Sequence, residues 1–210
     1  EARLAAFLTA SSALPLDLVE TAALSKAMVA AGDKLDWGRA VVVDKHSIGG
    51  LPGNRTTPIV VAIAAASGLL MPKTSSRAIT SPTGTADTME TLTNVDLDIA
   101  TMRRVVEAEG GCLAWGGAVR HSPADDIFIR IERVLDIDTE GQMIASVLSK
   151  KIAAGSTHVV IDIPVGATAK VRTKEAALGL SARLTDVAAQ CGLTAVCKLN
   201  DGTQPVGRGV

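Results

Sequence analysis

The chain has 210 residues, enough to bury a sizeable hydrophobic core in one large domain or two small ones, and its formal net charge is −1. This near-neutral charge argues against non-specific nucleic-acid binding. An aromatic content of 2%, without tyrosine, leaves few side chains for stacking on bases or for anchoring in a membrane interface. We therefore expect a protein that binds neither nucleic acid nor membrane.

The cysteines indicate the cellular compartment, and the ends of the sequence indicate whether it is a piece of a longer chain. Cys112, Cys191 and Cys197 have no CxxC spacing, which is typical of reduced, buried thiols rather than of a disulfide framework or a zinc site. The most apolar stretch, 58–72, is too short to cross a bilayer, and no signal peptide is visible. We expect a cytoplasmic protein. Because the sequence starts without methionine and stops in a glycine-rich stretch, we also expect it to be a piece of a longer chain.

The first half of the sequence alternates between helical and extended patterns. Residues 1–31 predict helix, with an apolar stripe formed by Leu16, Val19, Ala23, Ala27 and Ala30. The run 40–44 predicts a short buried parallel strand. Residues 56–68 predict a buried helix with a threonine N-cap and an early proline. A strand over 69–76 and a helix starting near 83–85 follow.

The second half continues this alternation. Residues 112–117 and 127–134 alternate between apolar and polar side chains, as strands do. Residues 141–155 predict a helix, 157–166 the clearest strand, and 173–192 the clearest long amphipathic helix. Strands alternating with helices predict an α/β fold, with a parallel or mixed sheet flanked by helices on both faces.

Three of the expected strand-to-helix loops, 44–57, 73–87 and 164–170, are rich in small or polar side chains. In α/β sheets, ligands bind beyond the carboxyl ends of the strands, where such loops lie. In the first loop, glycines let main-chain N–H groups approach an anion, and Lys45 adds a full positive charge. The second loop places hydroxyl side chains and Arg77 before another helix start. Two such loops facing each other would suit a phosphate together with a sugar.

Other interpretations of the first loop differ in strength. A nucleotide-binding P-loop is excluded because the spacing from Gly49 to Gly53 is one residue short and Asn54 stands where lysine is required. The dinucleotide motif GxGxxG is absent. An ordinary turn whose hydroxyl residues cap helices remains an alternative to anion binding. His46 could support its neighbours or react itself.

Two segments of the sequence resemble those of a known family and favour anion binding over an ordinary turn. "VVDKHSIGG" and "SSRAITSPTGTADTME" resemble the thymidine phosphorylase family, also called pyrimidine-nucleoside phosphorylases. The signature departs from the family pattern at Pro82, Thr83 and Met89, and it matches at Ser75, Ser76, Arg77, Ala78, Ile79, Gly84, Thr85, Asp87 and Glu90. "SVLSKK" and "GTQPVGR" also resemble family segments. "KHSIGGLPGN", "PADDI" and "DIDTEGQMIAS" are most similar to the branch that contains archaeal AMP phosphorylase and bacterial proteins named "putative thymidine phosphorylase".

This resemblance implies a fold and an activity. It implies a helical domain, 1–36 and about 138–156, hinged to an α/β phosphate-binding domain, 37–137 and 157–210, which is incomplete at its C-terminus. It implies a pentosyltransferase that cleaves the N-glycosidic bond of a nucleoside or nucleotide, with inorganic phosphate as co-substrate and without a metal or cofactor. It further implies a homodimer or higher oligomer, for which the stripe at 16–30 is a candidate surface.

The resemblance also assigns residues to roles. Phosphate binding is implied for Lys45, Ser47, Thr57 and Ser75. Nucleotide binding is implied for Gly50, Ser76, Arg77, Ala78, Ile79, Thr80, Ser81, Thr85, Ser146 and Lys170. Asp138 matches a proton donor, whereas the residues alone would make it the cap of the following helix. Lys170 could instead be a solvated loop lysine, and Ser146 a small residue at a helix contact.

The chemistry of phosphorolysis explains these residue types. Phosphate attacks C1′ of the sugar through an oxocarbenium-like state while the base leaves. A carboxylic acid can protonate the base if its pKa is raised by burial or by neighbouring carboxylates. Asp136 could be such a neighbour of Asp138. Thymidine phosphorylases carry a base-contacting arginine where this chain has Asp125, which favours a base that leaves protonated, such as adenine.

Two alternatives from other classes remain. Anthranilate phosphoribosyltransferase has the same type of fold and uses magnesium, but its glycine-rich signature is absent here. The chain could also be an inactive folding or oligomerisation module.

Overall fold

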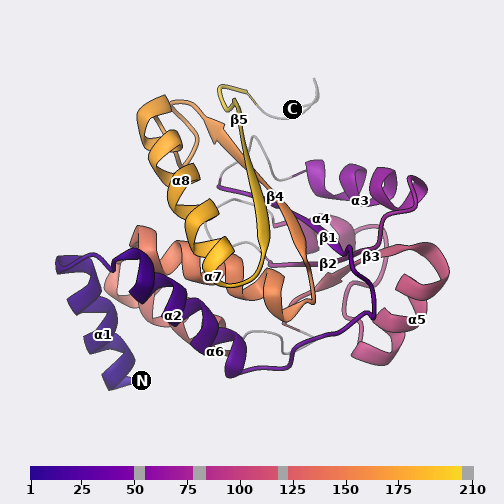
Figure 1. The fold of residues 1–210 in the computed structure, drawn as a ribbon, viewed down its shortest axis with the longest axis horizontal. Coiled ribbons are helices and arrows are strands. Elements are labelled where there is room, and N and C mark those ends of the chain that lie inside the picture. Colours follow the sequence, from indigo (N-terminus) through magenta and orange to yellow (C-terminus); the bar gives the residue numbers. More distant parts are fainter. Residues whose placement is uncertain (50–54, 78–83, 118–122, 205–210) are drawn as a thin grey trace.

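The structure, a computed structural model, describes residues 1–49, 55–77, 84–117 and 123–204 (Figure 1). Its elements, in chain order, are α1 (Ala2–Ala13), α2 (Leu18–Ala30), β1 (Val43–Ser47), α3 (Thr56–Ala66), β2 (Met71–Ser75), α4 (Thr85–Glu90), α5 (Ile99–Glu109), β3 (Gly111–Trp115), α6 (Pro123–Leu135), α7 (Glu140–Ala153), β4 (His158–Val165), α8 (Lys174–Gln190) and β5 (Thr194–Asp201).

The strands are parallel and form two groups, β1-β4-β5 and β2-β3. An isolated parallel bridge between Val42 and Leu70 joins the groups just before β1 and β2 begin, and the Val43 N–H donates to the Leu70 carbonyl at 2.9 Å. The spatial order is therefore β3-β2-β1-β4-β5, with β1 and β2 held together at their amino ends. Since no β1–β2 ladder continues within the described strands, their carboxyl ends are free to diverge around a ligand site.

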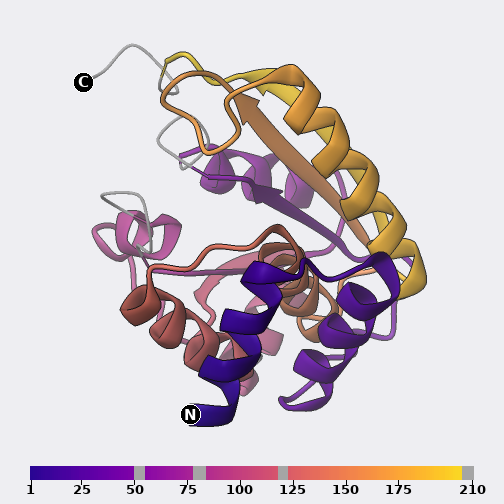
Figure 2. The same ribbon diagram turned by 90° about the vertical axis from the view of Figure 1, so that its left-hand side faces the viewer.

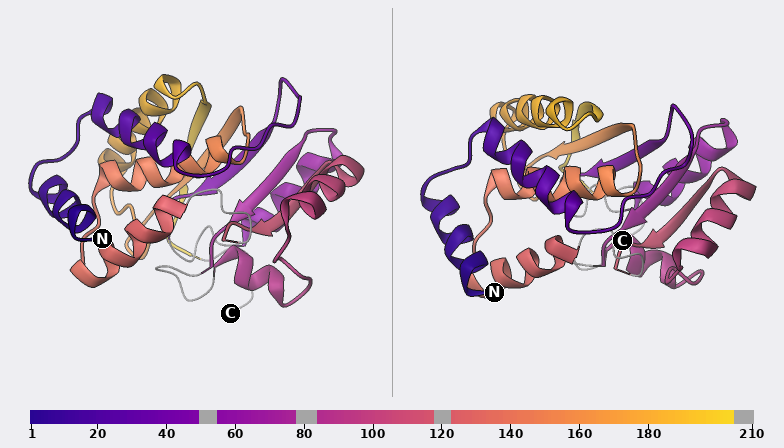
Figure 3. Two further views of the ribbon diagram at one scale, coloured as in Figure 1. Left: turned by 90° about the horizontal axis from the view of Figure 1, so that it is seen from below. Right: turned by 60° about the horizontal axis from the view of Figure 1, so that its bottom comes forward.

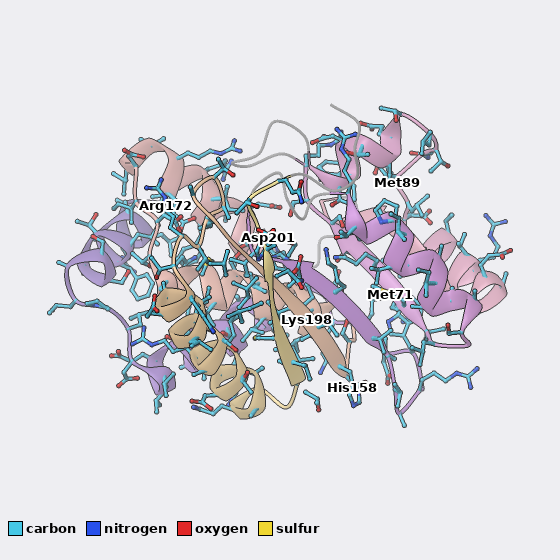
Figure 4. The ribbon with its side chains drawn as sticks, turned by 90° about the horizontal axis from the view of Figure 1, so that it is seen from above. Met71, Met89, His158, Arg172, Lys198 and Asp201 are labelled. Carbon is cyan, nitrogen blue, oxygen red and sulfur yellow. The ribbon has the colours of Figure 1, made fainter. Side chains whose placement is uncertain are left out.

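Helices cover these strands unevenly. α8 packs along β4 and β5, and residues of α2 and α7 complete the largest core there, around Leu148, Ile161 and Leu184 (Figure 2). α5 covers β2 and β3 through Met102 and Val106. Figure 4 shows His158 at the start of β4 and Asp201 at the end of β5, at opposite ends of the pair. All strands thus present their carboxyl ends in the same direction, as the predicted α/β class requires.

Four helices, α1, α2, α6 and α7, gather on one side of the molecule (Figure 3). Leu8, Met28, Phe128 and Ala145, one from each helix, share a small core. The Asp17 carboxylate and the Glu20 side chain form a reciprocal capping box that fixes the start of α2. α6 belongs to this group, although the predicted division assigns its residues to the α/β part. The division into two domains itself stays a prediction.

The predicted strand over 127–134 is wrong, because these residues lie within α6. Ala124, Phe128 and Ile131, spaced by four and three residues, pack into the small helical core. Short apolar alternation fits a strand and one face of a helix equally well, so the pattern did not decide between them.

Burial was also mispredicted in two places. α3 is not a buried helix: only Thr57 is buried, and Ile59 and Ile63 are 56% and 62% exposed. Its N-cap is Arg55, whose side chain makes no capping hydrogen bond. The β4–β5 pair is not covered on both faces by the described residues, since Val160 and Val196 are 46% and 59% exposed. Apolar composition predicts these elements but not which face a neighbour covers.

Smaller differences concern boundaries and omissions. The first strand runs from Val43 to Ser47 rather than over 40–44, and α5 and β5 were not predicted. On α2, the predicted stripe residues Val19, Ala23 and Ala27 are exposed, and the buried face consists of Thr21, Ala22, Ser25 and Met28. The cysteines are free, with Cys112 buried and the other two half-buried. None of the described helices combines the length and apolarity needed to cross a membrane.

Candidate active site

A cleft of about 870 Å³ opens at the carboxyl ends of β1 and β2 and is closed on its far side by α6 and α7. Every predicted site residue that the structure describes lines it: Lys45, Ser47, Thr57, Ser75, Ser76, Arg77, Thr85, Asp138, Ser146 and Lys170. The remaining ones, Gly50, Ala78, Ile79, Thr80 and Ser81, lie outside the described residues. Segments more than a hundred residues apart in sequence thus meet in one place.

The floor of the cleft is a buried charge cluster that the sequence did not predict. The Asp44 carboxylate on β1 lies 3.4 Å from Lys73 Nζ on β2 and 3.0 Å from Lys151 Nζ on α7. Burial alone would raise the pKa of Asp44, but the two ammonium groups outweigh burial and lower it. Burial lowers the pKa of Lys73 to about 7, against the attraction of Asp44. One carboxylate therefore ties both strand groups to the helical side.

The predicted phosphate-binding residues surround the end of β1. Lys45 is 5% exposed, and its ammonium group donates to the Thr56 hydroxyl in the first turn of α3. Burial lowers the pKa of Lys45, an effect that Asp162 opposes. The Ser47 hydroxyl donates to Asp162 Oδ2 at 2.9 Å. A lysine, hydroxyl groups and the start of an eleven-residue helix together provide what an oxyanion needs.

His46 lies between these lysines and lines the cleft. Burial, followed by the positive charges of Lys151, Lys73, Lys150 and Lys45, holds the pKa of His46 well below its ordinary value of 6.5. Its imidazole is therefore neutral at physiological pH and can donate one hydrogen bond and accept another. A neutral imidazole is not available as an imidazolium acid, which leaves His46 two roles, support for its neighbours and reaction as a base.

Arg77, two residues after β2, contacts side chains of β3 and α4. Its guanidinium lies 4.7 Å from the centroid of the Trp115 ring, its Nη2 donates to Glu90 Oε1 at 2.7 Å, and its Nη1 contacts Asp87 Oδ1 at 3.3 Å. Asp87 also accepts the Gly84 N–H at 2.9 Å. These contacts fix the start of α4, where Thr85 faces the cleft. The arginine and glutamate of the sequence signature therefore form an ion pair with each other.

Asp138 and Lys170 form an ion pair at the rim, with Asp138 Oδ2 2.8 Å from Lys170 Nζ. Helix α7 is capped by Thr139, whose hydroxyl accepts the Gln142 N–H, so Asp138 is not the cap. Lys170 is not simply solvated either: a Cβ on Gly49, whose φ is +74°, would lie 2.4 Å from the Lys170 Cβ. The lysine stem thus crosses the glycine that follows β1.

The helical wall carries carboxyl groups. Asp125, which is buried, accepts from Lys150 Nζ at 2.8 Å, and the same ammonium group donates to the Ser146 hydroxyl at 3.0 Å. Glu132 is half-buried, and burial, followed by the charges of Asp125 and Asp138, raises its pKa to about 7. One wall of the cleft therefore holds a carboxyl group, that of Glu132, which can carry a proton near neutral pH, opposite the lysines of the floor. The described residues contain no cluster of His, Cys, Asp or Glu suited to a metal ion.

Comparison with known proteins shows the family to which this fold and this cleft belong. The profile described as "Glycosyl transferase family, a/b domain" matches residues 39–206, so the chain belongs to this family. The fold resembles the crystal structure of anthranilate phosphoribosyltransferase from Thermus thermophilus, with a TM-score of 0.76 and 20% sequence identity over 98% of this chain and 58% of that one. This likeness shows the shared fold.

Closer relatives carry a more specific name. A "Putative thymidine phosphorylase" from Chelativorans sp. (strain BNC1) is 73% identical over 210 residues, which are 100% of this chain and 41% of that protein. A protein of the same name from Parvibaculum lavamentivorans is 70% identical over 207 residues, 99% of this chain and again 41% of the relative. The predicted family relationship is confirmed, and the chain spans about 41% of the length of these relatives.

Proposed function

We propose that the protein is a phosphorylase that transfers the pentosyl group of a nucleoside or nucleoside 5′-monophosphate to inorganic phosphate. The observation that carries this proposal is a single cleft with lysines and hydroxyl groups at the strand ends and carboxyl groups opposite, among them Glu132, whose pKa is raised to about 7. In the reaction, the bond from C1′ to the base nitrogen breaks, a bond from C1′ to a phosphate oxygen forms, and the base leaves with a proton.

Phosphate would bind between β1 and the first turns of α3. Lys45, Ser47, Thr57 and Ser75 line this part of the cleft, and each can donate to a phosphate oxygen. Because these donors stand in a pocket that the fold has already built, little reorganisation is needed when charge develops in the transition state. The buried lysines of the floor lie behind them and add to the positive potential.

The nucleotide would lie across the cleft between α4 and α7. Ser76, Thr85, Ser146 and Lys170 line its path, while Arg77 acts through the position of α4. Gly50 and residues 78–81 complete the proposed set. A 5′-phosphate would take Lys170 as its counter-ion, since the ammonium group of this residue faces the cleft from its rim.

Asp138 is the proposed proton donor, and its ion pair explains when it would act. In the structure the Asp138 carboxylate is paired with the Lys170 ammonium group. A substrate phosphate that recruits Lys170 would release Asp138 from this pair and leave it beside Glu132, a carboxyl group whose pKa is raised to about 7. Substrate binding would thus prepare the acid.

A substrate panel on the full-length protein tests the proposal. Thymidine, uridine, cytidine and AMP would each be incubated with and without inorganic phosphate, in the presence and absence of EDTA. We expect base release that requires phosphate and persists in EDTA, because the proposed mechanism needs no metal or cofactor. Base release without phosphate would indicate a hydrolase, and a magnesium requirement would favour the phosphoribosyltransferase alternative.

The assembly and setting are proposals of the same kind. We propose a homodimer or higher oligomer with a role in nucleotide salvage in the cytoplasm. The exposed stripe of α2, with Val19 68% exposed, is an apolar surface that a second copy could cover. Sedimentation of the full-length protein with and without Val19→Glu would test this contact.

A further inference from the structure

One face of α7 turns a row of polar side chains toward the cleft. Gln142, Ser146 and Lys150 follow one another at intervals of four residues and all line the cleft, as does Asp138 one turn before them. Lys150 bonds to Ser146 and to Asp125, so that part of the row is satisfied within the protein. Gln142 differs from its neighbours in the row.

The side chain of Gln142 is 2% exposed, yet neither its amide nitrogen nor its amide oxygen has a hydrogen-bond partner among the described residues. The same holds for Asp125 Oδ1, on a side chain that is 3% exposed. Leaving a buried polar atom unpaired is destabilising, so native proteins rarely keep such atoms without a use. These atoms on two adjoining helices of one cleft are unlike the rest of the described side chains, where no further buried side-chain nitrogen or oxygen lacks a partner.

The three unpaired atoms differ in their hydrogen-bonding character. Gln142 Oε1 and Asp125 Oδ1 are acceptors, while Gln142 Nε2 is a donor. A complementary ligand must therefore offer two N–H donors and one acceptor next to them. Adenine and cytosine do so through the two hydrogens of the exocyclic amino group and the adjacent ring nitrogen. Uracil and thymine offer a single ring N–H between two carbonyl oxygens, which would face the carboxylate with an acceptor.

We propose that Gln142 and Asp125 recognise the base. The site would then bind a nucleoside or nucleotide whose base carries an exocyclic amino group. Gln142 exchanges two hydrogen bonds with the base, one from the amino group and one to the ring nitrogen beside it. Asp125 accepts the second amino hydrogen while Lys150 holds its other oxygen. The inference rests on the proposed function for the location of the base, but it concerns recognition and can be measured without turnover.

The test measures ligand binding and stability together in the full-length protein and its Gln142→Leu variant. Calorimetric titrations would use AMP, cytidine 5′-monophosphate, uridine 5′-monophosphate and, as a probe without a base, ribose 5-phosphate. We expect the wild-type protein to prefer AMP or cytidine 5′-monophosphate over uridine 5′-monophosphate. In Gln142→Leu, this preferred nucleotide should bind about 10–100-fold more weakly, because two hydrogen bonds of about 1 kcal/mol each are lost. Ribose 5-phosphate should bind as before.

Thermal unfolding supplies the readout that a structural role would not give. Replacing an unpaired buried amide by leucine should leave the midpoint temperature unchanged or raise it. Gln190→Leu at the exposed end of α8 is the matched control and should leave binding unchanged. If Gln142→Leu fails to fold, Gln142→Met keeps the length of the side chain and is measured in its place.

Each outcome is decisive. AMP and cytidine 5′-monophosphate separate the purine from the pyrimidine with an amino group. Equal binding of uridine 5′-monophosphate, unchanged affinity in Gln142→Leu, or a lower midpoint with parallel loss of ribose 5-phosphate binding would overturn the inference. The amino-base preference without phosphate-dependent base release would refute the proposed function alone. Phosphorolysis without the preference would refute the inference alone.

Discussion

The cleft holds two sets of ion pairs with similar distances and different surroundings. On the floor, Asp44 meets Lys73 and Lys151 at 3.4 and 3.0 Å, and all three side chains are at most 4% exposed. At the rim, Asp138 meets Lys170 at 2.8 Å, but the two side chains are 61% and 33% exposed. Distance alone would rank the rim pair as the stronger. Burial decides otherwise, because a buried charge without its partner is costly and an exposed one is solvated.

This difference separates what holds the site together from what can change during a reaction. The floor connects β1, β2 and α7, and removing its one carboxylate would leave two buried ammonium groups without their counter-ion. The rim pair is exposed and can open at low cost, which would free Lys170 for the proposed substrate anion and Asp138 for the proposed proton transfer. The predictions below test this division.

The largest effect should follow from Asp44→Asn. It leaves the ammonium groups of Lys73 and Lys151 buried without their shared counter-ion, which should cost about 3–5 kcal/mol of the free energy of unfolding. Urea denaturation of the variant and of Asp186→Asn, a control at an exposed position of α8, would measure the difference. Adding Lys73→Met to Asp44→Asn should recover part of the loss. A loss below about 1 kcal/mol would place this cluster with ordinary surface pairs.

Asp138→Asn should affect turnover and not stability. Asparagine preserves size and polarity, so nucleotide binding should change little, and an exposed ion pair contributes only about 0–1 kcal/mol to stability. Turnover should fall by about 10²–10⁴-fold, because the base would lose its proton donor. Kinetics with AMP and with an analogue whose base leaves readily would show a smaller loss for the analogue. Equal losses on both substrates would remove Asp138 from the acid role.

Lys45→Met should weaken phosphate binding while the aliphatic stem stays packed. A charged hydrogen bond contributes about 1.5–3 kcal/mol, so the affinity for inorganic phosphate should fall by about 10–100-fold. Calorimetric titration with phosphate would compare this variant with Lys34→Met, at an exposed position before β1. An unchanged affinity in Lys45→Met would exclude this lysine from the phosphate site.

The smallest effect at neutral pH concerns two groups whose pKa values both lie at about 7. The pKa of Lys73 on the floor is lowered from 10.5, so the unfolded chain binds more protons between about pH 7 and 10.5 and stability rises with pH there. The pKa of Glu132 near the rim is raised from 4.5, so the folded chain binds more protons between about pH 4.5 and 7 and stability falls as pH rises.

Variants that remove one group at a time should separate these two windows. Lys73→Met should flatten the alkaline part of the stability profile, and Glu132→Gln the acidic part, by a few degrees in midpoint temperature over the respective window. Thermal unfolding from pH 4 to 10 would record both profiles. Parallel profiles of wild type and variant would show that the group in question titrates at its ordinary pKa.

The sequence predicted residues that line one cleft better than it predicted the burial around them. Lys45 lies near the end of β1, Ser75 ends β2 and Thr85 begins α4. Because the carboxyl ends of parallel strands lie at one edge of a sheet, their meeting was predictable. Family resemblance placed Asp138 and Lys170 there too, and nothing in their local sequence would have done so. The helix over 127–134 was misassigned because short alternation does not distinguish a strand from one helical face.

What could not be predicted depends on contacts between distant elements. Lys73 and Lys151 stand 78 residues apart, and only the folded chain shows that both face Asp44. A lysine in a predicted strand could have indicated a buried partner of opposite charge, but the local sequence does not show which residue that partner is. The unpaired amide of Gln142 is a property of packing alone, since glutamine in an amphipathic helix ordinarily faces water.

The most direct test of the proposed reaction follows the phosphate itself. The full-length protein would be incubated with AMP, or with the nucleotide it prefers, and inorganic phosphate labelled with heavy oxygen, and the sugar product would be analysed by mass spectrometry. Attack of phosphate on C1′ predicts a sugar 1-phosphate that retains every label of the phosphate, formed in equal amount to the free base. Free base accompanied by an unphosphorylated C1′ hydroxyl, or no labelled sugar phosphate, would contradict phosphorolysis in this cleft.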